Sequence, residues 1–326
     1  MKIITDEKIN EFRAFIGSHS FFFIIGHKEP DGDAIFSCLG MAALLKKLGK
    51  DVQLLSAGPF KRHEIKDKAG LFTDTPRALS QSERKSAAIV VLDCSERSRF
   101  GEINGDLSGI DTYIIDHHKT ADAKENCIID PTSPATACLV QQIYEKTVGP
   151  VPQDVAKELF FGLSTDTGFF RFLKEDSAEV FRQAARLVEA GANPRTTHDE
   201  MAGGKSLSTR KLLGIMLDRA EAKFGGKLIV TYETMDDTKK FGQDGRDSDA
   251  LYSLLLAIEG VEAVLFVRQD SEDTCTAGFR SRDKVDVSAI AAKFGGGGHK
   301  NAAGLSIEGK LGNVIPKFCA EFQKIL

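Results

Sequence analysis

The first half of the chain alternates between short apolar runs and segments with apolar residues at helical spacing. Residues 21–25 (Phe-Phe-Phe-Ile-Ile) are apolar throughout, which is typical of a strand buried on both faces. A polar loop separates them from residues 34–48, where apolar residues recur every three or four positions up to Gly49. Three further strand-like runs follow, at 52–55, 87–92 and 113–115. This alternation predicts an α/β fold whose mainly parallel sheet carries helices on both faces.

The pattern changes twice beyond this region. From about residue 135 to residue 220 the apolar spacing is mostly helical, and the pair Gly225-Gly226 then interrupts it. The last hundred residues again alternate strand-like and helix-like segments, and they are numerous enough to bury a core of their own. We therefore expect an N-terminal catalytic domain over 1–194, a helical linker over 195–222 and a smaller C-terminal α/β domain over 223–326.

Charge and composition limit the partners. The 43 Lys and Arg residues nearly balance 47 Asp and Glu residues, giving a net charge of −4, so the basic footprint that long duplex DNA requires is missing. The apolar stretches fall short of the ~20 residues of a membrane span, and the N-terminus lacks the layout of a signal peptide. The six cysteines show no CxxC spacing, which argues against a disulfide framework and a structural zinc site. We expect a cytoplasmic protein with no membrane partner.

Four groups of acidic and imidazole side chains stand out along the first half of the chain. They are the segment 26–33 (GHKEPDGD) after the first strand, Asp93 after the run 87–92, the triplet 116–118 (Asp-His-His) after the run 113–115, and Asp166 within an apolar stretch. Ligands bind at the carboxyl ends of the strands in an open parallel sheet. Each group alone also has a structural interpretation, since Asp31 or Asp33 can cap the following helix and Asp93 can be a turn residue.

Two histidines and four aspartates from these groups are a suitable ligand set for two divalent cations. Carboxylates and imidazoles suit Mn²⁺, with Mg²⁺ or Co²⁺ as alternatives, and the absence of thiolates argues against structural zinc. Two such ions ~3.5–4 Å apart can clamp a phosphoryl oxygen and lower the pKa of a water toward ~7. The pattern therefore predicts hydrolysis of phosphate esters.

The order and spacing of these groups resemble the motifs of the DHH phosphoesterase superfamily. The resemblance is carried by His27-x3-Asp31-x-Asp33, Asp93 after a strand, the triplet 116–118 and Asp166 in a Thr-Asp-Thr-Gly context. In addition, the run 295–304 (GGGGHKNAAG) is similar to the glycine-rich signature of the associated C-terminal domain. Taken together, the motifs cover roughly residues 20–305, and the fold implied is the two-domain α/β arrangement expected above.

The resemblance also implies residue roles. The implied metal ligands are His27 and Asp31 for one ion, Asp33, His117 and Asp166 for the other, and Asp93 as the bridge between them. His118 would protonate the leaving oxygen or stabilise developing charge, and Asp116 would orient the histidines.

Six further residues are expected to bind substrate. They are Gly297, Gly298 and His299 in the glycine run, Arg280 and Ser281 at the end of a predicted strand, and, as a weaker candidate, Arg171 near Asp166. Arginine suits phosphate because its guanidinium forms a bidentate fork. On composition alone the four consecutive glycines could equally form a flexible linker. A helix candidate before the run and small residues after it favour a binding loop.

By size, the chain resembles the short RecJ-like branch of the superfamily that acts as nanoRNase, also described as oligoribonuclease and 3′-phosphoadenosine 5′-phosphate (pAp) phosphatase. This implies an exonuclease-type phosphodiesterase that releases mononucleotides from short single-stranded oligonucleotides, with pAp dephosphorylation as a second activity. One alternative is a phosphodiesterase for cyclic di-AMP or its linear product pApA. An alternative of another class is a nucleotide-binding receptor without catalysis. A homodimer is compatible with either class.

Overall fold

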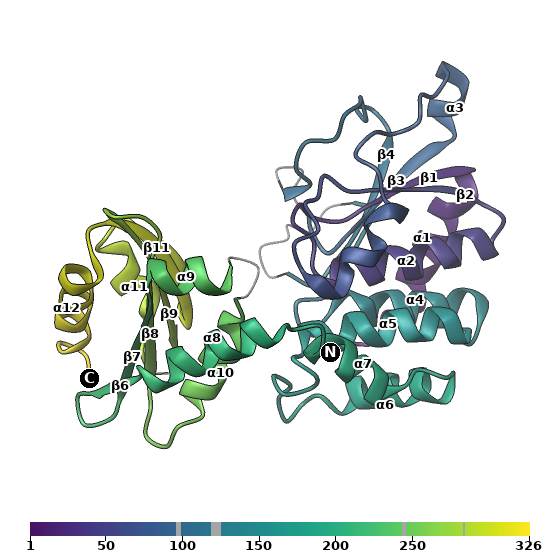
Figure 1. The fold of residues 1–326 in the computed structure, drawn as a ribbon. Helices are drawn as coiled ribbons and strands as arrows, with labels where there is room; N and C mark the ends of the chain where they lie inside the picture. The colour runs from purple at the N-terminus through teal and green to yellow at the C-terminus, as the bar shows by residue number, and fades with distance from the viewer. Residues whose placement is uncertain (96–98, 119–124, 243–245, 283) are drawn as a thin grey trace. The chain divides into compact units, whose positions relative to one another are not determined.

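The computed structural model describes residues 1–95, 99–118, 125–242, 246–282 and 284–326. The chain forms two compact units, Met1–Gly204 and Lys205–Leu326. The division falls within the range 195–222, so helix α7 (Pro194–Ala202) belongs to the first unit and helix α8 (Leu207–Asp218) to the second (Figure 1). Within the described residues, no helix is both long and apolar enough to span a membrane.

A five-stranded sheet forms the centre of the first unit. Its strands are β1 (Phe21–Ile25), β2 (Asp51–Leu55), β3 (Ala87–Leu92), β4 (Asp111–Asp116) and β5 (Cys127–Ile129), in the order β2-β1-β3-β4-β5. All neighbouring pairs are parallel. The predicted parallel sheet is therefore confirmed, with β4 longer than expected and β5 added at the edge. Continuous burial along β1 and β3 agrees with their uninterrupted apolar sequences.

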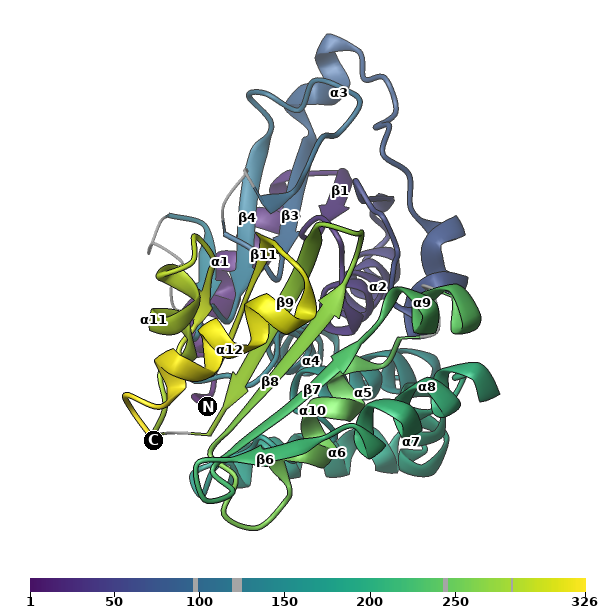
Figure 2. The same ribbon diagram turned by 60° about the vertical axis from the view of Figure 1, so that its left-hand side comes forward.

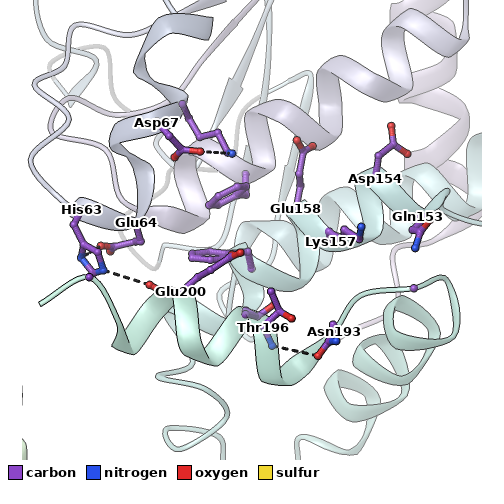
Figure 3. Close-up of a pocket in the computed structure, with 16 residues that line it drawn as sticks. His63, Glu64, Asp67, Gln153, Asp154, Lys157, Glu158, Asn193, Thr196 and Glu200 are labelled. Atoms are coloured by element: carbon purple, nitrogen blue, oxygen red, sulfur yellow. Dashed lines mark hydrogen bonds and ion pairs between the residues drawn. The ribbon is translucent and has the colours of Figure 1, made fainter.

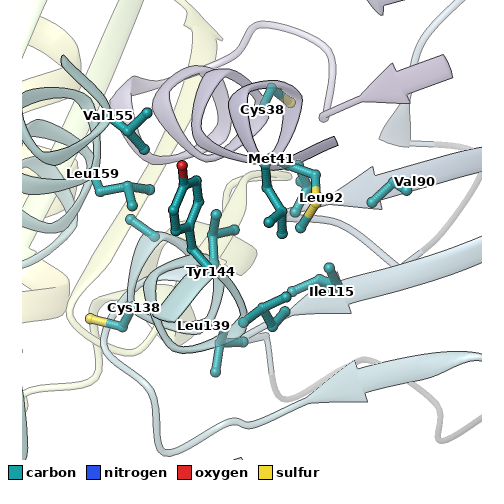
Figure 4. Close-up of a cluster of buried hydrophobic side chains, with 14 of the residues drawn as sticks. Cys38, Met41, Val90, Leu92, Ile115, Cys138, Leu139, Tyr144, Val155 and Leu159 are labelled. Carbon is teal, nitrogen blue, oxygen red and sulfur yellow. The ribbon is translucent and has the colours of Figure 1, made fainter. Parts of the chain in front are cut away.

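Helices pack in layers on one face of this sheet. They are α1 (Asp6–Ser18), α2 (Gly32–Lys47), α4 (Thr136–Val148), α5 (Gln153–Asp166) and α6 (Ala178–Glu189). Of these, α5 and α6 lie against the helices α2 and α4 rather than against the strands. Figure 4 shows Met41, Leu139 and Tyr144 from the helices in one buried cluster with Leu92 and Ile115 from the strands. Each fully buried side chain of this kind contributes about 1.5–3 kcal/mol to stability. This core fixes the positions of the strand ends that carry the polar groups.

The opposite face has a smaller core and no long helix among the described residues. Phe23, Ile25 and Val91 of the strands form a second cluster, against which Phe100 and Ile103 pack from the segment before β4. The short helix α3 (Gln81–Lys85) buries no residue. The sequence predicted helices on both faces of the sheet. On this face, apolar side chains from the segments that connect the strands cover most of the sheet instead. A 3-10 helix, η1 (His63–Leu71), lies between β2 and β3 in sequence.

The second unit is built on a six-stranded mixed sheet. Its strands are β6 (Glu221–Lys223), β7 (Leu228–Glu233), β8 (Ala263–Gln269), β9 (Thr274–Ser281), β10 (Gly297–His299) and β11 (Ala302–Glu308), in the order β10-β11-β9-β8-β7-β6. Only β7 and β8 pair in parallel. The remaining helices are α9 (Met235–Phe241), α10 (Ser248–Leu256), α11 (Val287–Ala292) and α12 (Leu311–Phe322).

Both faces of the second sheet are covered by helices. One core contains Phe279 of β9 together with Ile290 of α11 and Phe318 of α12. The other contains Val264 of β8 with Leu213 of α8 and residues of α10. Figure 2 shows α12 crossing one face of the sheet. Two separate hydrophobic cores explain why this region reads as an independent α/β unit in the sequence.

The glycine run is partly a strand. Gly297–His299 form β10 and pair antiparallel with β11, whereas the sequence predicted a loop throughout. Gly298 has φ +144°, and a Cβ there would lie 2.5 Å from the carbonyl oxygen of Ala302. Glycine is therefore required at residue 298 by both backbone conformation and close approach.

Candidate functional site

Each predicted metal-binding residue of the first unit lies at the end of a regular element. His27 follows β1, Asp31 is the N-cap of α2, Asp33 lies in its first turn, Asp93 follows β3, His117 follows β4, and Asp166 is the last residue of α5. Strands β1, β3 and β4 are neighbours in a parallel sheet, so their carboxyl ends meet at one edge. The fold thus brings six side chains from distant parts of the sequence to the same edge.

Two backbone features allow this approach. A Cβ at Gly32 would lie 2.6 Å from the side chain of Thr165, so only glycine lets the start of α2 approach the end of α5. Asp93 has φ +60°, the left-handed region that costs a non-glycine residue about 1–3 kcal/mol. Its backbone N–H donates to the carbonyl of Ile115 at 3.0 Å, which holds Asp93 in this conformation beside β4.

His27 faces two carboxylates. Its Nε2 lies 3.7 Å from Asp31 Oδ1 and 3.5 Å from Asp93 Oδ2. Its Nδ1 donates to the carbonyl of Lys28 at 2.8 Å, because a carbonyl oxygen only accepts hydrogen bonds. This contact fixes the ring and leaves Nε2 as the nitrogen available to a cation.

His117 has a similar arrangement on the other side of Asp93. Its Nε2 lies 3.3 Å from Asp93 Oδ1 and 3.4 Å from Asp166 Oδ2, and its Nδ1 donates to the carbonyl of Ser133 at 3.2 Å. Nε2 is buried, yet within the described part of the chain no group meets it in hydrogen-bonding geometry. A buried nitrogen lone pair directed toward two carboxylates fits a cation held among them.

Asp33 is held by the start of α4. The backbone N–H groups of Thr136 and Ala137 donate to its two oxygens at 2.5 and 2.8 Å, and the hydroxyl of Ser37 donates at 3.2 Å. The N-cap of α4 is Ala135, which has no side-chain acceptor, so Asp33 takes over the capping role from another helix. Thr136 also donates its hydroxyl to Asp93 Oδ1 at 3.0 Å. Sequence reasoning missed Thr136, although the helix start without a capping residue was a usable signal.

The ligand atoms form three overlapping groups. They are His27 with Asp31 and Asp93, Asp33 with His117 and Asp166, and Asp93 with His117 and His118, and within each group the ligand atoms lie within 4.8 Å of one another. Asp93 and His117 belong to two groups each. The structure therefore brings all six predicted metal-binding residues together, with Asp93 between the other two sets.

The electrostatics of this acidic cluster favour positive charge. Burial and the neighbouring carboxylates Asp93 and Asp166 raise the pKa of Asp33 well above its usual range, and burial with nearby carboxylates raises the pKa of Asp166 to about 7. Burial opposes ionisation of Asp93, but His117 and His27 outweigh it and lower the pKa of Asp93. Burial also opposes charge on both histidines, yet the carboxylates raise each histidine pKa to about 10. Oxygen and imidazole donors of this kind suit Mn²⁺, Mg²⁺ or Co²⁺.

His118 and Asp116 form a pair beside the cluster. Nδ1 of His118 donates to Asp116 Oδ1 at 2.7 Å, and the backbone N–H of His118 donates to the same oxygen at 3.1 Å. Asp116 is fully buried, whereas the side chain of His118 is 34% exposed. Asp116 therefore orients the imidazole, and Nε2 of His118 is the nitrogen that a substrate can reach.

The substrate-binding residues predicted in the second unit do not all lie on the same face of its sheet. His299 is opposite Ala302 on β11, and Ala302 is opposite Arg280 on β9, so His299 and Arg280 lie on the same face. Ser281 follows Arg280 directly and therefore points to the other face. There its hydroxyl donates to the carbonyl of Val285 at 2.6 Å, which suits a structural role in the turn.

A row of glycines lies next to Arg280 and His299. Gly297 is opposite Gly304, and Gly304 is opposite Gly278, which leaves a strip of three strands without side chains. At Gly297 and Gly304 this lets a ligand approach the backbone closely, whereas the side chain of Tyr252 extends to Gly278. The remaining candidate, Arg171, belongs to the first unit, where it is exposed and its guanidinium carbon lies 4.8 Å from the ring centroid of Phe172.

A separate cavity of about 940 Å³ lies between η1, α5 and α7 in the first unit (Figure 3). Phe36 and Phe161, with ring centroids 4.6 Å apart, line it together with Glu158 and Lys68. Burial raises the pKa of Glu158 to about 7, partly offset by Lys68. None of the predicted site residues lines this cavity, so it is distinct from the acidic cluster.

Comparisons with known proteins give matches in both units of the chain. The profile of the DHH family, N-terminal domain, matches residues 22–163, and that of the DHHA1 domain matches residues 225–326. The chain is 33% identical over 289 residues to the bifunctional oligoribonuclease and PAP phosphatase NrnA of Thermus thermophilus, covering 88% of this chain and 84% of that protein. It is 25% identical to the protein of the same description from Bacillus subtilis, covering 86% and 87%.

One solved structure shares the whole fold. An exopolyphosphatase-related protein from Bacteroides fragilis aligns with a TM-score of 0.85 at 23% identity, covering 99% of this chain and 98% of that one. At this identity the likeness concerns the fold, and it extends over both units.

Proposed function

The chain belongs to the DHH family of phosphoesterases, and on that premise we propose that it is a metal-dependent phosphodiesterase that hydrolyses short oligonucleotides to mononucleotides. Two relatives over most of its length are described as oligoribonuclease and PAP phosphatase, which supports this substrate class. Removal of the 3′-phosphate from pAp is the second activity we propose on the same grounds.

The convergence on Asp93 is the observation that carries the proposal. Its two oxygens face His27 on one side and His117 on the other, at 3.5 and 3.3 Å. The donor atoms are carboxylate oxygens and imidazole nitrogens, which suit divalent cations. Among the described residues, Nε2 of His117 has no hydrogen-bond partner, which also fits a bound cation. We propose His27 and Asp31 as ligands of one ion, Asp33, His117 and Asp166 as ligands of the other, and Asp93 as the bridge.

When bound, two divalent cations supply Lewis acidity toward a phosphoryl oxygen and generate a nucleophile from water. The chain's own residues then have separate roles. His118 carries a proton on Nε2 to the leaving oxygen, because its Nδ1 is engaged by Asp116 at 2.7 Å. Asp116 keeps the imidazole in that tautomer and orientation.

The second unit is proposed to bind the nucleotide. Arg280 and His299 share one face of the sheet, and the bare backbone of Gly297 and Gly304 lies beside them. A guanidinium and an imidazole suit a phosphate, and the bare backbone gives room for a sugar or base. Small substrates agree with the net charge of −4, because the chain carries no overall excess of positive charge for the backbone of a long nucleic acid.

A substrate panel tests the function. The purified chain is incubated with Mn²⁺ and one of four substrates, namely a linear dinucleotide, a ~24-mer oligonucleotide, pAp or cyclic di-AMP. The ~24-mer is longer than a usual single-strand binding site. We expect mononucleotide release from the dinucleotide, slower release from the ~24-mer, and loss of activity with EDTA. Equal rates on both lengths would contradict the short-substrate proposal. Faster cleavage of cyclic di-AMP than of the dinucleotide would favour that alternative instead.

The same panel separates an enzyme from a receptor. Recovery of intact dinucleotide after prolonged incubation with Mn²⁺, together with measurable binding, would overturn the enzymatic proposal. Phosphate release from pAp is measured in the same reactions, and its absence would remove only the second activity. The Asp93→Asn variant serves as the inactive control for contaminating nucleases.

A further inference from the structure

Arg280 rests on an aromatic ring. Its guanidinium carbon lies 4.5 Å from the ring centroid of Tyr252, which α10 supplies from the same unit. Tyr252 is only 6% exposed, and its ring packs edge-on against Phe266 at a centroid distance of 6.3 Å. Burial raises the pKa of Tyr252 to about 12, so the ring is neutral at physiological pH. The guanidinium therefore faces a fixed and uncharged π surface.

The residue two positions before Arg280 makes room for this ring. Gly278 and Arg280 lie on the same face of β9, because side chains alternate along a strand. A Cβ at Gly278 would collide with the hydroxyl oxygen of Tyr252 and lie 3.3 Å from its Cζ. Glycine at this position thus lets Tyr252 extend beneath Arg280.

The ring holds Arg280 without neutralising it. Among the described residues, the guanidinium of Arg280 contacts the Tyr252 ring and donates from Nη1 to the neighbouring carbonyl of Phe279 at 3.0 Å, and it forms no ion pair with a carboxylate. A carboxylate partner would orient the guanidinium but would also cancel its charge. An aromatic face orients it and leaves the charge and the remaining N–H donors for an anionic ligand.

We propose that Tyr252 is a positioning residue that holds the Arg280 guanidinium in the orientation in which it meets a phosphate of the nucleotide substrate. The inference rests on the proposed function, in which Arg280 contacts that phosphate. Tyr252 itself does not contact the reacting atoms. Its removal therefore weakens substrate binding and leaves the chemical step unchanged.

The first test compares Tyr252→Leu with Tyr252→Phe on the dinucleotide with Mn²⁺. Loss of the ring is expected to raise KM by about 2-fold to 30-fold, the range that cation–π energies correspond to, with kcat little changed. Tyr252→Phe keeps the ring and is expected to restore KM. Leu213→Ala, in the same hydrophobic core on α8, is the matched packing control and should leave KM unchanged.

Arg280→Ala makes failure of this inference distinguishable from failure of the proposed function. If Arg280→Ala leaves KM unchanged, Arg280 does not bind the substrate and the binding role proposed above is wrong. If Arg280→Ala raises KM and Tyr252→Leu does not, the positioning role alone is overturned. The double variant is expected to have the KM of Arg280→Ala, since the ring acts only through the guanidinium.

Gly278→Ala provides a second route if Tyr252→Leu fails to fold. The added Cβ is expected to displace the tyrosine ring and raise KM. Combining it with Tyr252→Phe removes the colliding hydroxyl and should bring KM back toward the original value. A KM increase that Tyr252→Phe does not relieve would mean that the methyl group obstructs the substrate directly, and would overturn the positioning role.

Discussion

The backbone N–H of Thr136 donates to the carboxylate of Asp33, 103 residues earlier in the chain, at 2.5 Å. Two helices are joined by this contact, because Asp33 lies in the first turn of α2 and Thr136 begins α4. The start of a helix carries partial positive charge, which opposes the rise that burial and neighbouring carboxylates cause in the pKa of Asp33. The same residue reaches Asp93 through its hydroxyl, so one helix terminus supports two of the proposed metal ligands.

Replacing Thr136 by valine should weaken metal binding. The substitution keeps the shape and the backbone contact to Asp33 but removes the hydroxyl that donates to Asp93 at 3.0 Å. Loss of such a supporting hydrogen bond typically lowers metal affinity by about 10–100-fold. Calorimetric titration with Mn²⁺ measures it. Thr132→Val, which removes a hydroxyl bonded to Asp130 outside the cluster, is the control, and equal affinities in both variants would contradict the role of Thr136.

Asp93→Asn should abolish activity while the fold is retained. The amide has the shape of the carboxylate but cannot bridge two cations, and Asp93 contributes to two of the three ligand groups. We expect a loss greater than the ~100-fold typical of residues outside the ligand set, with fewer Mn²⁺ ions bound per chain. Mononucleotide release and metal content are measured together. Retained activity would refute the bridging assignment, and the surface variant Asp106→Asn should behave as the unmodified chain.

His118→Asn tests proton transfer separately from metal binding. Removing a general acid typically lowers kcat by about 10²–10⁴-fold. Bound Mn²⁺ should remain at the original stoichiometry, since the six proposed ligands are intact. Because His118 also lies within ligand distance of Asp93, loss of metal in this variant would reassign it as a ligand. His198→Asn on α7 is the control, as it lies outside the cluster.

Glu158→Gln should stabilise the protein at high pH only. Burial raises the pKa of Glu158 from 4.5 to about 7, so the folded state binds its proton more tightly than the unfolded state. Stability is therefore lost as pH rises between about 4.5 and 7, and this loss is absent in the glutamine variant. Because the carboxyl is partly exposed, we expect a gain of only about 1–2 kcal/mol at pH 8 and little change at pH 4.5.

Urea unfolding at the two pH values measures this difference. Glu175→Gln removes an exposed carboxyl elsewhere in the same unit and should show no such pH dependence. If Glu158→Gln changes the free energy of unfolding by the same amount at both pH values, burial in the cavity does not raise the pKa of Glu158.

Several features of the fold and the site follow from local sequence patterns. The apolar runs at residues 21–25 and 87–92 become β1 and β3 without any change of bounds, because their short length and their aromatic and β-branched residues favour a strand covered on both faces. The polar groups at their ends are equally visible in sequence. Their common edge follows from the parallel order of the strands, which the alternation with helices predicts.

Other features depend on residues far apart in sequence. No local pattern links Asp33 to the start of α4, or Tyr252 to Arg280, since each contact depends on how helices pack against a sheet. The alternation of side chains along a strand predicts that Arg280 and Ser281 point in opposite directions. Only the pairing with β11 shows which of them shares a face with His299. The second face of the first sheet is likewise covered by irregular segments. These have no hydrophobic periodicity, so the sequence could not predict them.

The sequence alone determined which chemical groups are present and at which strand and helix ends they stand, because hydrophobic periodicity is a local property of the chain. Only the tertiary structure decided which of these groups meet, at what distance and in what charge state. Burial and the approach of carboxylates and imidazoles arise when distant segments pack into one core, and those interactions set both the distances around Asp93 and the pKa values of its neighbours.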